Sequence, residues 1–142
     1  MFGNCTSLTT APALPATTVA DYCYSGMFEY CSSLTTAPIL YATTLAQFCY
    51  SGMFNGCTSL TTAPTLPAIT LETGCYYNIF YGCSNLNYIK AMFTTAPGNE
   101  YTQNWVNGVS ATGTFVKNSA ASWTTTGTSG VPSGWTVETA AS

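Results

Sequence analysis

The chain has 142 residues, of which 46% are hydrophobic and only 5% are charged, and its formal net charge is −3. Two basic residues cannot build a track for a phosphate backbone, so the composition excludes nucleic-acid binding and attraction to an anionic membrane surface. The 10 Tyr, 7 Phe and 3 Trp argue against disorder. No apolar run approaches the roughly 20 residues that cross a bilayer, so we expect no membrane insertion.

The sequence repeats itself every 26 residues, starting at its first residue. Residues 1–26, 27–52 and 53–78 begin MFGNCTSLTTAP, MFEYCSSLTTAP and MFNGCTSLTTAP, and a fourth copy begins at Ile79 before the pattern fades. A fixed period of this length is typical of stacked repeats. The repeat starts without a basic leader, so we expect no signal peptide in this chain and expect that further repeats precede it. The alternative is that Met1 is the native start and that the first coil lacks an N-terminal cap.

Each repeat contains the pattern of a short strand followed by a short helix. Leu, two Thr and a terminating Pro predict the strand. In the first copy Thr18 and Asp21 have capping-box spacing, and Val19, Cys23 and Met27 follow at intervals of four, which predicts a helix over Val19–Phe28. We therefore expect an α/β repeat: a leucine-rich-repeat-like solenoid of about 26-residue coils. The predicted strands lie at residues 7–12, 33–38 and 59–64.

No single coil can bury its own apolar side chains, so stacking should bury them as continuous ladders. Within the predicted helix, Gly26 and Gly52 indicate close approach between neighbouring coils. The residues before Cys5, Cys31, Cys57 and Cys83 are Asn4, Tyr30, Gly56 and Gly82, and three of these four tolerate a left-handed conformation, which indicates a helix C-cap. The expected core ladders are Phe2, Phe28, Phe54, Phe80; Leu8, Leu34, Leu60, Leu86; Cys5, Cys31, Cys57, Cys83; and Cys23, Cys49, Cys75.

The period is lost from about Lys90, which predicts two parts: a solenoid over residues 1–89 and a C-terminal cap over residues 90–142. Trp105, Phe115, Trp123 and Trp135 supply large apolar area for covering the open end of the stack. The alternative is a small attachment module that uses exposed Trp side chains as anchors.

The seven cysteines allow three interpretations: disulfides, a metal site, or free thiols that pack as small apolar residues. If the predicted helical spacing continues to Cys31, Cys23 and Cys31 lie eight residues apart, which is too far for a disulfide. Structural zinc requires close ligand pairs, and the chain has neither a CxxC motif nor a histidine. We favour free buried thiols and expect no metal and no cofactor.

Catalytic patterns are equally scarce. A serine or cysteine nucleophile needs a neighbouring base, and histidine is absent. The five acids occupy different repeat positions, so no carboxylate pair is predicted. We expect a protein that is not an enzyme.

The candidate binding surface consists of Thr and Tyr side chains. One Thr of each pair should point outward, forming a ladder at strand spacing. Tyr is common in interfaces because it combines area with a polar tip. Solvated strand Thr and an ice-binding Thr array are the other two interpretations of this ladder. The candidate face comprises Thr9, Thr35, Thr61, Tyr22, Tyr30, Tyr41 and Tyr50.

The recurring MF-x-x-C-x-S-L stretches at residues 1–8, 27–34 and 53–60, with a related stretch at 79–86, resemble the repeats of BspA-like leucine-rich-repeat bacterial surface proteins. The resemblance covers residues 1–89 and departs from the family in the Ala-Pro-x-Leu-Pro-Ala segment and in the longer period. The C-terminal segment, with GTFVKN and SGVPSGWTVE, is similar to endings of such arrays in gut-bacterial and phage-associated proteins. The resemblance implies an extracellular location, at a cell or virion surface. It implies a role in adhesion and no catalytic residues.

The leading hypothesis is a non-enzymatic adhesion or protein-interaction domain whose partner is a host or cell-surface protein or glycan. The alternative is a structural spacer that self-associates through its first coil, because an open coil leaves apolar surface exposed.

Overall fold

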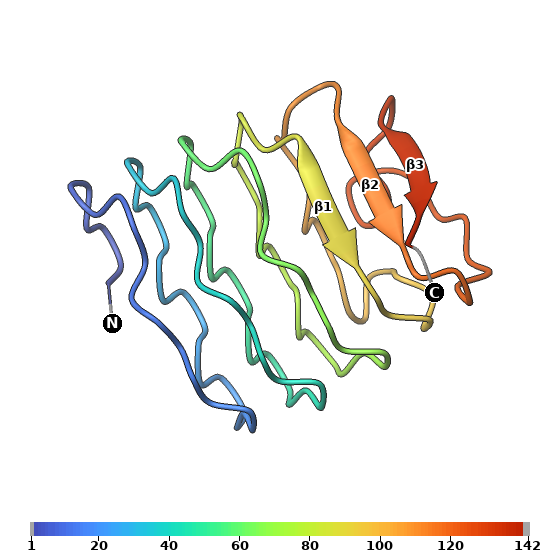
Figure 1. The fold of residues 1–142 in the computed structure, drawn as a ribbon, viewed down its shortest axis with the longest axis horizontal. Coiled ribbons are helices and arrows are strands. Elements are labelled where there is room, and N and C mark those ends of the chain that lie inside the picture. The colour runs from blue at the N-terminus through green and yellow to red at the C-terminus, as the bar shows by residue number, and fades with distance from the viewer. Residues whose placement is uncertain (1, 141–142) are drawn as a thin grey trace.

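The computed structural model describes residues 2–140, which form a row of coils lying side by side along the length of the molecule (Figure 1). Neighbouring coils are joined by backbone hydrogen bonds between residues about one repeat apart. The Phe2 amide, for example, donates to the Met27 carbonyl at 2.9 Å, and the Tyr24 amide donates to the Cys49 carbonyl at 2.9 Å. Each coil therefore uses the next as its hydrogen-bonding partner.

One side of each coil, which we call the turn side, is a run of consecutive tight turns. Every second amide bonds a carbonyl three residues earlier, as Met27 does to Tyr24 at 3.2 Å. The amides between them bond the next coil, as Phe28 does to Met53 at 2.9 Å. The backbone thus divides its donors equally between its own turns and its neighbour. The turn side comprises residues 20–31, 46–57, 72–83 and 98–109.

A left-handed residue recurs every fourth position along the turn side. The central column is Gly26 (φ 64°), Gly52 (64°), Asn78 (52°) and Asn104 (54°). Gly and Asn are the residues that adopt this conformation at least cost. The recurring Ser-Gly pairs are therefore backbone requirements of the turns. The flanking columns are Tyr22, Phe48 and Gly74, and Asn4, Tyr30, Gly56, Gly82 and Gly108.

The expected α/β class is wrong, because residues 2–140 contain three short strands and no helix. The predicted helix Val19–Phe28 falls on the turn side. An α-helix bonds each amide to the carbonyl four residues earlier, whereas here alternate amides leave the coil and positive φ interrupts any helical run. Asp21, expected in a capping box, instead accepts a hydrogen bond from the Gln47 amide of the next coil at 3.0 Å.

The other side of the coils, which we call the strand side, carries parallel pairing. Isolated bridges join Thr10 to Thr36 and Thr62 to Tyr88. Regular strands then form at β1 (Tyr88–Ala91), β2 (Thr114–Lys117) and β3 (Thr136–Thr139), in one parallel sheet of order β1-β2-β3. β1 contains the predicted boundary between residues 89 and 90, and its pairing of Tyr88 with Thr114 keeps the 26-residue offset.

The core lies between the two sides and is built from stacked columns of like side chains. Phe28, Phe54 and Phe80 are fully buried, with ring centroids 5.7 and 5.9 Å apart. Leu34, Leu60 and Leu86 are also fully buried. Phe2 and Leu8 of the first coil are half-buried, because no preceding coil lies against them in the described part of the chain.

A second aromatic column, Tyr24, Tyr50 and Tyr76, runs parallel to the Phe column with centroids 6.0 Å apart. Both columns end on Trp105, whose ring lies 6.1 Å from Tyr76 and 6.3 Å from Phe80. The Trp105 indole donates to the Gly130 carbonyl at 2.8 Å. Trp105 therefore joins the repeated columns to the C-terminal segment.

The remaining C-terminal aromatics continue this core and are not exposed anchors. Phe115 is fully buried, and Trp123 and Trp135 are 6% and 7% exposed. Both of these indoles donate to backbone carbonyls, Trp123 to Phe93 and Trp135 to Ser110. Because their rings are enclosed, they are not available to a partner as surface stacking platforms.

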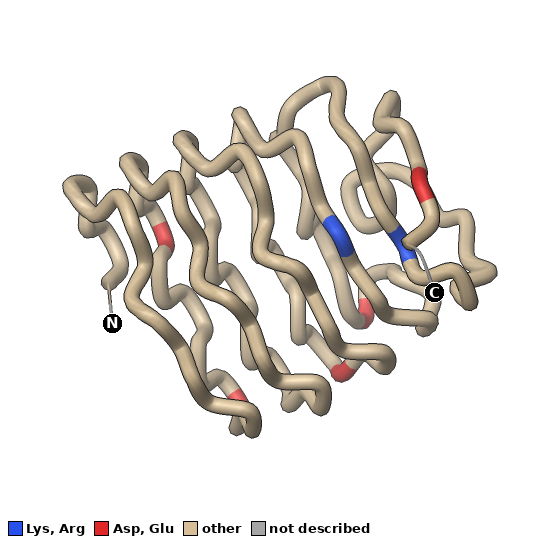
Figure 2. Tube along the Cα trace, viewed as in Figure 1, with Lys and Arg blue, Asp and Glu red and all other residues tan. Residues whose placement is uncertain are grey.

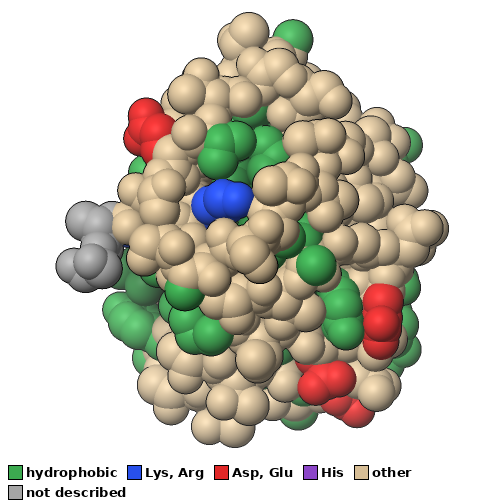
Figure 3. All heavy atoms as spheres, turned by 90° about the vertical axis from the view of Figure 1, so that its right-hand side faces the viewer, with side chains coloured by type: hydrophobic (Ala, Val, Ile, Leu, Met, Phe, Trp, Pro, Cys, Tyr) green, Lys and Arg blue, Asp and Glu red, His purple; other side chains and the backbone are tan. Residues whose placement is uncertain are grey.

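Charged side chains are few and scattered over the stack (Figure 2). The C-terminal end likewise presents mainly uncharged atoms (Figure 3). Lys117 is engaged inside this end: its Nζ donates to the Trp123 carbonyl at 2.7 Å and lies 5.1 Å from the Trp123 ring centroid. Among residues 2–140 no helix has the length and apolarity needed to cross a membrane.

Candidate binding surfaces

The strand side exposes two rows of threonines. Thr9, Thr35 and Thr61 form the predicted row, and all three are exposed. The Thr35 hydroxyl donates to the Thr9 carbonyl at 3.2 Å, which ties it to the preceding coil. Hydrogen-bonded strands lie about 4.8 Å apart, so hydroxyls on paired coils repeat at that spacing. A second exposed row, which sequence reasoning did not single out, comprises Thr10, Thr36 and Thr62.

The predicted tyrosines do not gather beside these threonines. Tyr22 (60% exposed) and Tyr30 (49%) lie on the turn side, whereas Tyr41 (50%) lies in the stretch between strand side and turn side. Tyr50 is 1% exposed and belongs to the buried Tyr column, so its assignment to the binding face is corrected. The candidate residues are therefore divided between two surfaces.

The turn side carries an aromatic strip that includes residues missed from the sequence. Tyr22 stacks on Phe48 with centroids 5.0 Å apart, and Phe48 meets Tyr77 edge-on at 5.4 Å. The next position in this column is Gly74, and a Cβ there would overlap the Phe48 ring. Tyr30 likewise covers Gly56. The sequence contained a signal for this packing, because in both cases an aromatic residue is followed 26 residues later by a glycine.

The cysteines occupy two columns whose first members are exposed. Cys5 and Cys23, expected in the core, are exposed, whereas the five remaining thiols are fully buried and free. In one column each thiol donates to a Phe carbonyl of the preceding coil, Cys57 to Phe28 at 3.1 Å and Cys83 to Phe54 at 3.0 Å. The thiols thus act as small buried donors.

Burial also makes these thiols weak acids. It raises the pKa of Cys49 to about 11 and the pKa values of Cys57 and Cys75 to about 12. Since nucleophilic attack and metal binding require the thiolate, these three side chains are unreactive at neutral pH. In the part of the chain that the structure describes, no three Cys, Asp, Glu or His side chains group as metal ligands.

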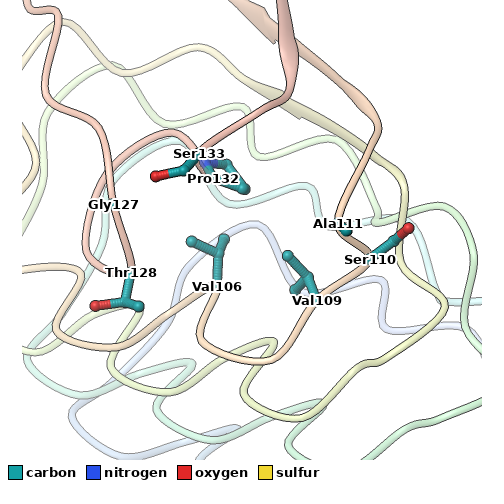
Figure 4. Close-up of a pocket in the computed structure, with 8 residues that line it drawn as sticks. All are labelled: Val106, Val109, Ser110, Ala111, Gly127, Thr128, Pro132 and Ser133. Atoms are coloured by element: carbon teal, nitrogen blue, oxygen red, sulfur yellow. The ribbon is translucent and has the colours of Figure 1, made fainter.

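The depressions of the surface include two shallow ones with different linings. The first, of about 200 Å³, lies near the C-terminal end (Figure 4). Its Val106, Val109 and Pro132 side chains face one another, while the hydroxyls of Thr128 and Ser133 turn away from its centre. It therefore offers little polar chemistry to a ligand.

The second depression, of about 220 Å³, lies on the strand side between the second and third coils. We call it the inter-coil groove. Hydroxyl groups contribute to its rim and short apolar side chains to its floor. Its lining residues are Thr35, Thr36, Ala37, Thr62, Ala63 and Pro64.

Comparison with known proteins adds no relative: no family model matches the chain, and neither a curated protein nor a solved structure matches it significantly.

Proposed function

We propose that the chain is a non-enzymatic adhesion or interaction domain at a cell or virion surface, in keeping with its resemblance to BspA-like surface repeats. The observation that carries the proposal is the strand side, where two exposed rows of threonines stand on successive coils of the stack. A fixed backbone presents these hydroxyls at little entropic cost on binding.

The partner is expected to be a cell-surface protein or glycan. The near absence of charge on the stack makes long-range electrostatic steering unimportant, so recognition by the strand side depends on its shape and its hydroxyls. A surface of this kind suits a partner whose own surface is neutral or weakly polar.

A cell-binding assay with two matched variants tests this function. Wild-type protein, labelled through its N-terminus, is expected to bind bacterial or host cells saturably. Thr35→Lys with Thr61→Lys should lower binding about tenfold or more, because two charges enter the contact. Gln47→Lys changes the exposed turn side and should bind as wild type does. Absence of saturable binding to any cell type, or equal binding by all three proteins, would refute the proposal.

A second candidate function is self-association through the first coil. It is favoured by the exposed Cys5, whose equivalents Cys31 and Cys57 are fully buried. Sedimentation of the same samples separates the candidates: growth in mass with concentration indicates self-association, and a constant monomer mass removes it.

A further inference from the structure

The backbone pairing at the Thr-Thr-Ala stretch joins the first coil to the second and the third to the fourth, but it does not join the second to the third. Between the first and second coils the Ala11 amide donates to the Thr36 carbonyl at 3.0 Å. Between the third and fourth, the Ala63 amide donates to the Tyr88 carbonyl at 3.0 Å. The corresponding bond from Ala37 to Thr62 is absent, although these residues are well within the described range.

Between the second and third coils several backbone groups have no hydrogen-bond partner among the described residues. At the groove they include the amides of Ala37 and Thr62 and the carbonyls of Thr35 and Thr62. They lie where the inter-coil groove opens, since all three residues line it. Unpaired backbone groups need a partner, and a groove open to solvent admits one from outside.

Contacts between the second and third coils limit the width of the groove at the end where the chain leaves the turn side. The Ser59 hydroxyl donates to the Ser32 carbonyl at 2.6 Å, and the Cys57 thiol to the Phe28 carbonyl at 3.1 Å. An inserted peptide strand would need about twice the 4.8 Å strand spacing between these coils. The groove therefore excludes a peptide strand and admits small groups that reach in from a ligand lying across it.

The chemistry of the lining defines those groups. None of the six lining residues is charged. The Thr36 and Thr62 hydroxyls make no hydrogen bond within the described chain and can both donate and accept, whereas the Thr35 hydroxyl already donates to Thr9. Ala63 and Pro64 provide an apolar floor, and Tyr88, 36% exposed, pairs with Thr62 in the next coil.

We propose that the inter-coil groove is a subsite for a neutral sugar, a hexose or N-acetylhexosamine, whose hydroxyl or amide groups bond the unpaired backbone of Ala37 and Thr62 and the hydroxyls of Thr36 and Thr62. The hydroxyls of a sugar both donate and accept hydrogen bonds, as the unpaired groups of the groove require. The apolar face of the sugar ring suits Ala63, Pro64 and the neighbouring Tyr88. This inference rests on the proposed adhesion function and names the ligand class of its strand side.

An NMR titration of isotope-labelled protein tests the subsite. The probes are the methyl glycosides of glucose, galactose, mannose, N-acetylglucosamine and N-acetylgalactosamine. At least one is expected to shift the amide signals of Ala37 and Thr62 saturably, with smaller changes at Ala11. Thr36→Val and Thr62→Val should each weaken that binding roughly three- to tenfold, because each removes one hydrogen-bonding hydroxyl.

Thr10→Val is the matched control, since Thr10 occupies the same exposed row outside the groove; its affinity should equal that of wild type. The subsite is overturned if no glycoside shifts the groove amides, or if all three Val variants bind equally. If Thr36→Val and Thr62→Val still bind cells as wild type does, the sugar subsite is refuted and the adhesion function stands. If the wild-type protein binds no cells, the adhesion function itself is refuted.

Discussion

Raising the pH from about 8 to about 11 is expected to unfold the protein cooperatively. Burial raises the pKa of Cys49 to about 11 and those of Cys57 and Cys75 to about 12, from an ordinary value of 9.0. These groups stay neutral in the folded state while the unfolded chain ionises them. Their stabilising contribution is complete below about pH 9 and is lost as the pH rises through the folded-state values.

The expected magnitude is large. Each thiol that is neutral when folded and ionised when unfolded lowers the free energy of unfolding by about 1.4 kcal/mol per pH unit. Three such groups give up to about 4 kcal/mol per unit, against a total stability of about 5–15 kcal/mol for ordinary domains. Tyr50 and Tyr76 add to the effect above about pH 10, since burial raises their pKa values as well.

Denaturant unfolding monitored by circular dichroism at a series of pH values measures this slope. Cys57→Ala should reduce it by about 1.4 kcal/mol per pH unit in the alkaline range, at some cost to stability at pH 7. Cys23→Ala, at an exposed position, should change the slope much less than Cys57→Ala does. A free energy of unfolding that is flat to pH 11, or equally altered by both variants, would contradict the burial of these thiols.

Gly74→Ala is expected to destabilise the protein by about 2–4 kcal/mol. Gly74 has φ of 64°, where an L-residue costs roughly 1–2 kcal/mol. The added methyl would also overlap the Phe48 ring, which is held between Tyr22 and Tyr77 and cannot move without losing both contacts. Losing such aromatic contacts costs about 0.5–1.5 kcal/mol each.

The control is Gly98→Ala, because no atom lies within 4 Å of a Cβ placed there and its φ lies outside the left-handed region. Its effect should stay within about 0.5 kcal/mol. A double-mutant cycle with Phe48→Ala separates the two causes: the overlap should disappear and the conformational strain should remain. Equal stability of Gly74→Ala and Gly98→Ala would show that the turn side does not have the described backbone.

The 26-residue period was readable from the sequence, but the conformation inside it was not. Val19, Cys23 and Met27 recur every four residues, which suits one helix face. The turn side has the same spacing, because its left-handed positions also recur every fourth residue. The distinguishing signal was the column of Gly26, Gly52 and Asn78, whereas aromatic residues at Tyr22 and Phe48 concealed the neighbouring column.

The candidate surface was predicted only in part for a similar reason. Exposure of Thr9, Thr35 and Thr61 follows from polarity at a strand position. Tyr50 is buried because its column faces the core between the two sides, a direction that depends on the turn geometry. The inter-coil groove could not be predicted at all, because the segments around Ala37 and Thr62, which do not pair with each other, have nearly the same sequence as the segments around Ala11 and Thr36, which do.

Scalar couplings across hydrogen bonds, measured by NMR, test the stacked-coil structure most directly. We expect couplings from the amide nitrogen of Phe28 to the carbonyl carbon of Met53, and from that of Gly52 to that of Tyr77, because these donor–acceptor distances are 2.9 and 2.7 Å. A coupling from Phe28 to the carbonyl of Tyr24, four residues earlier as in a helix, would contradict the stacked-coil structure.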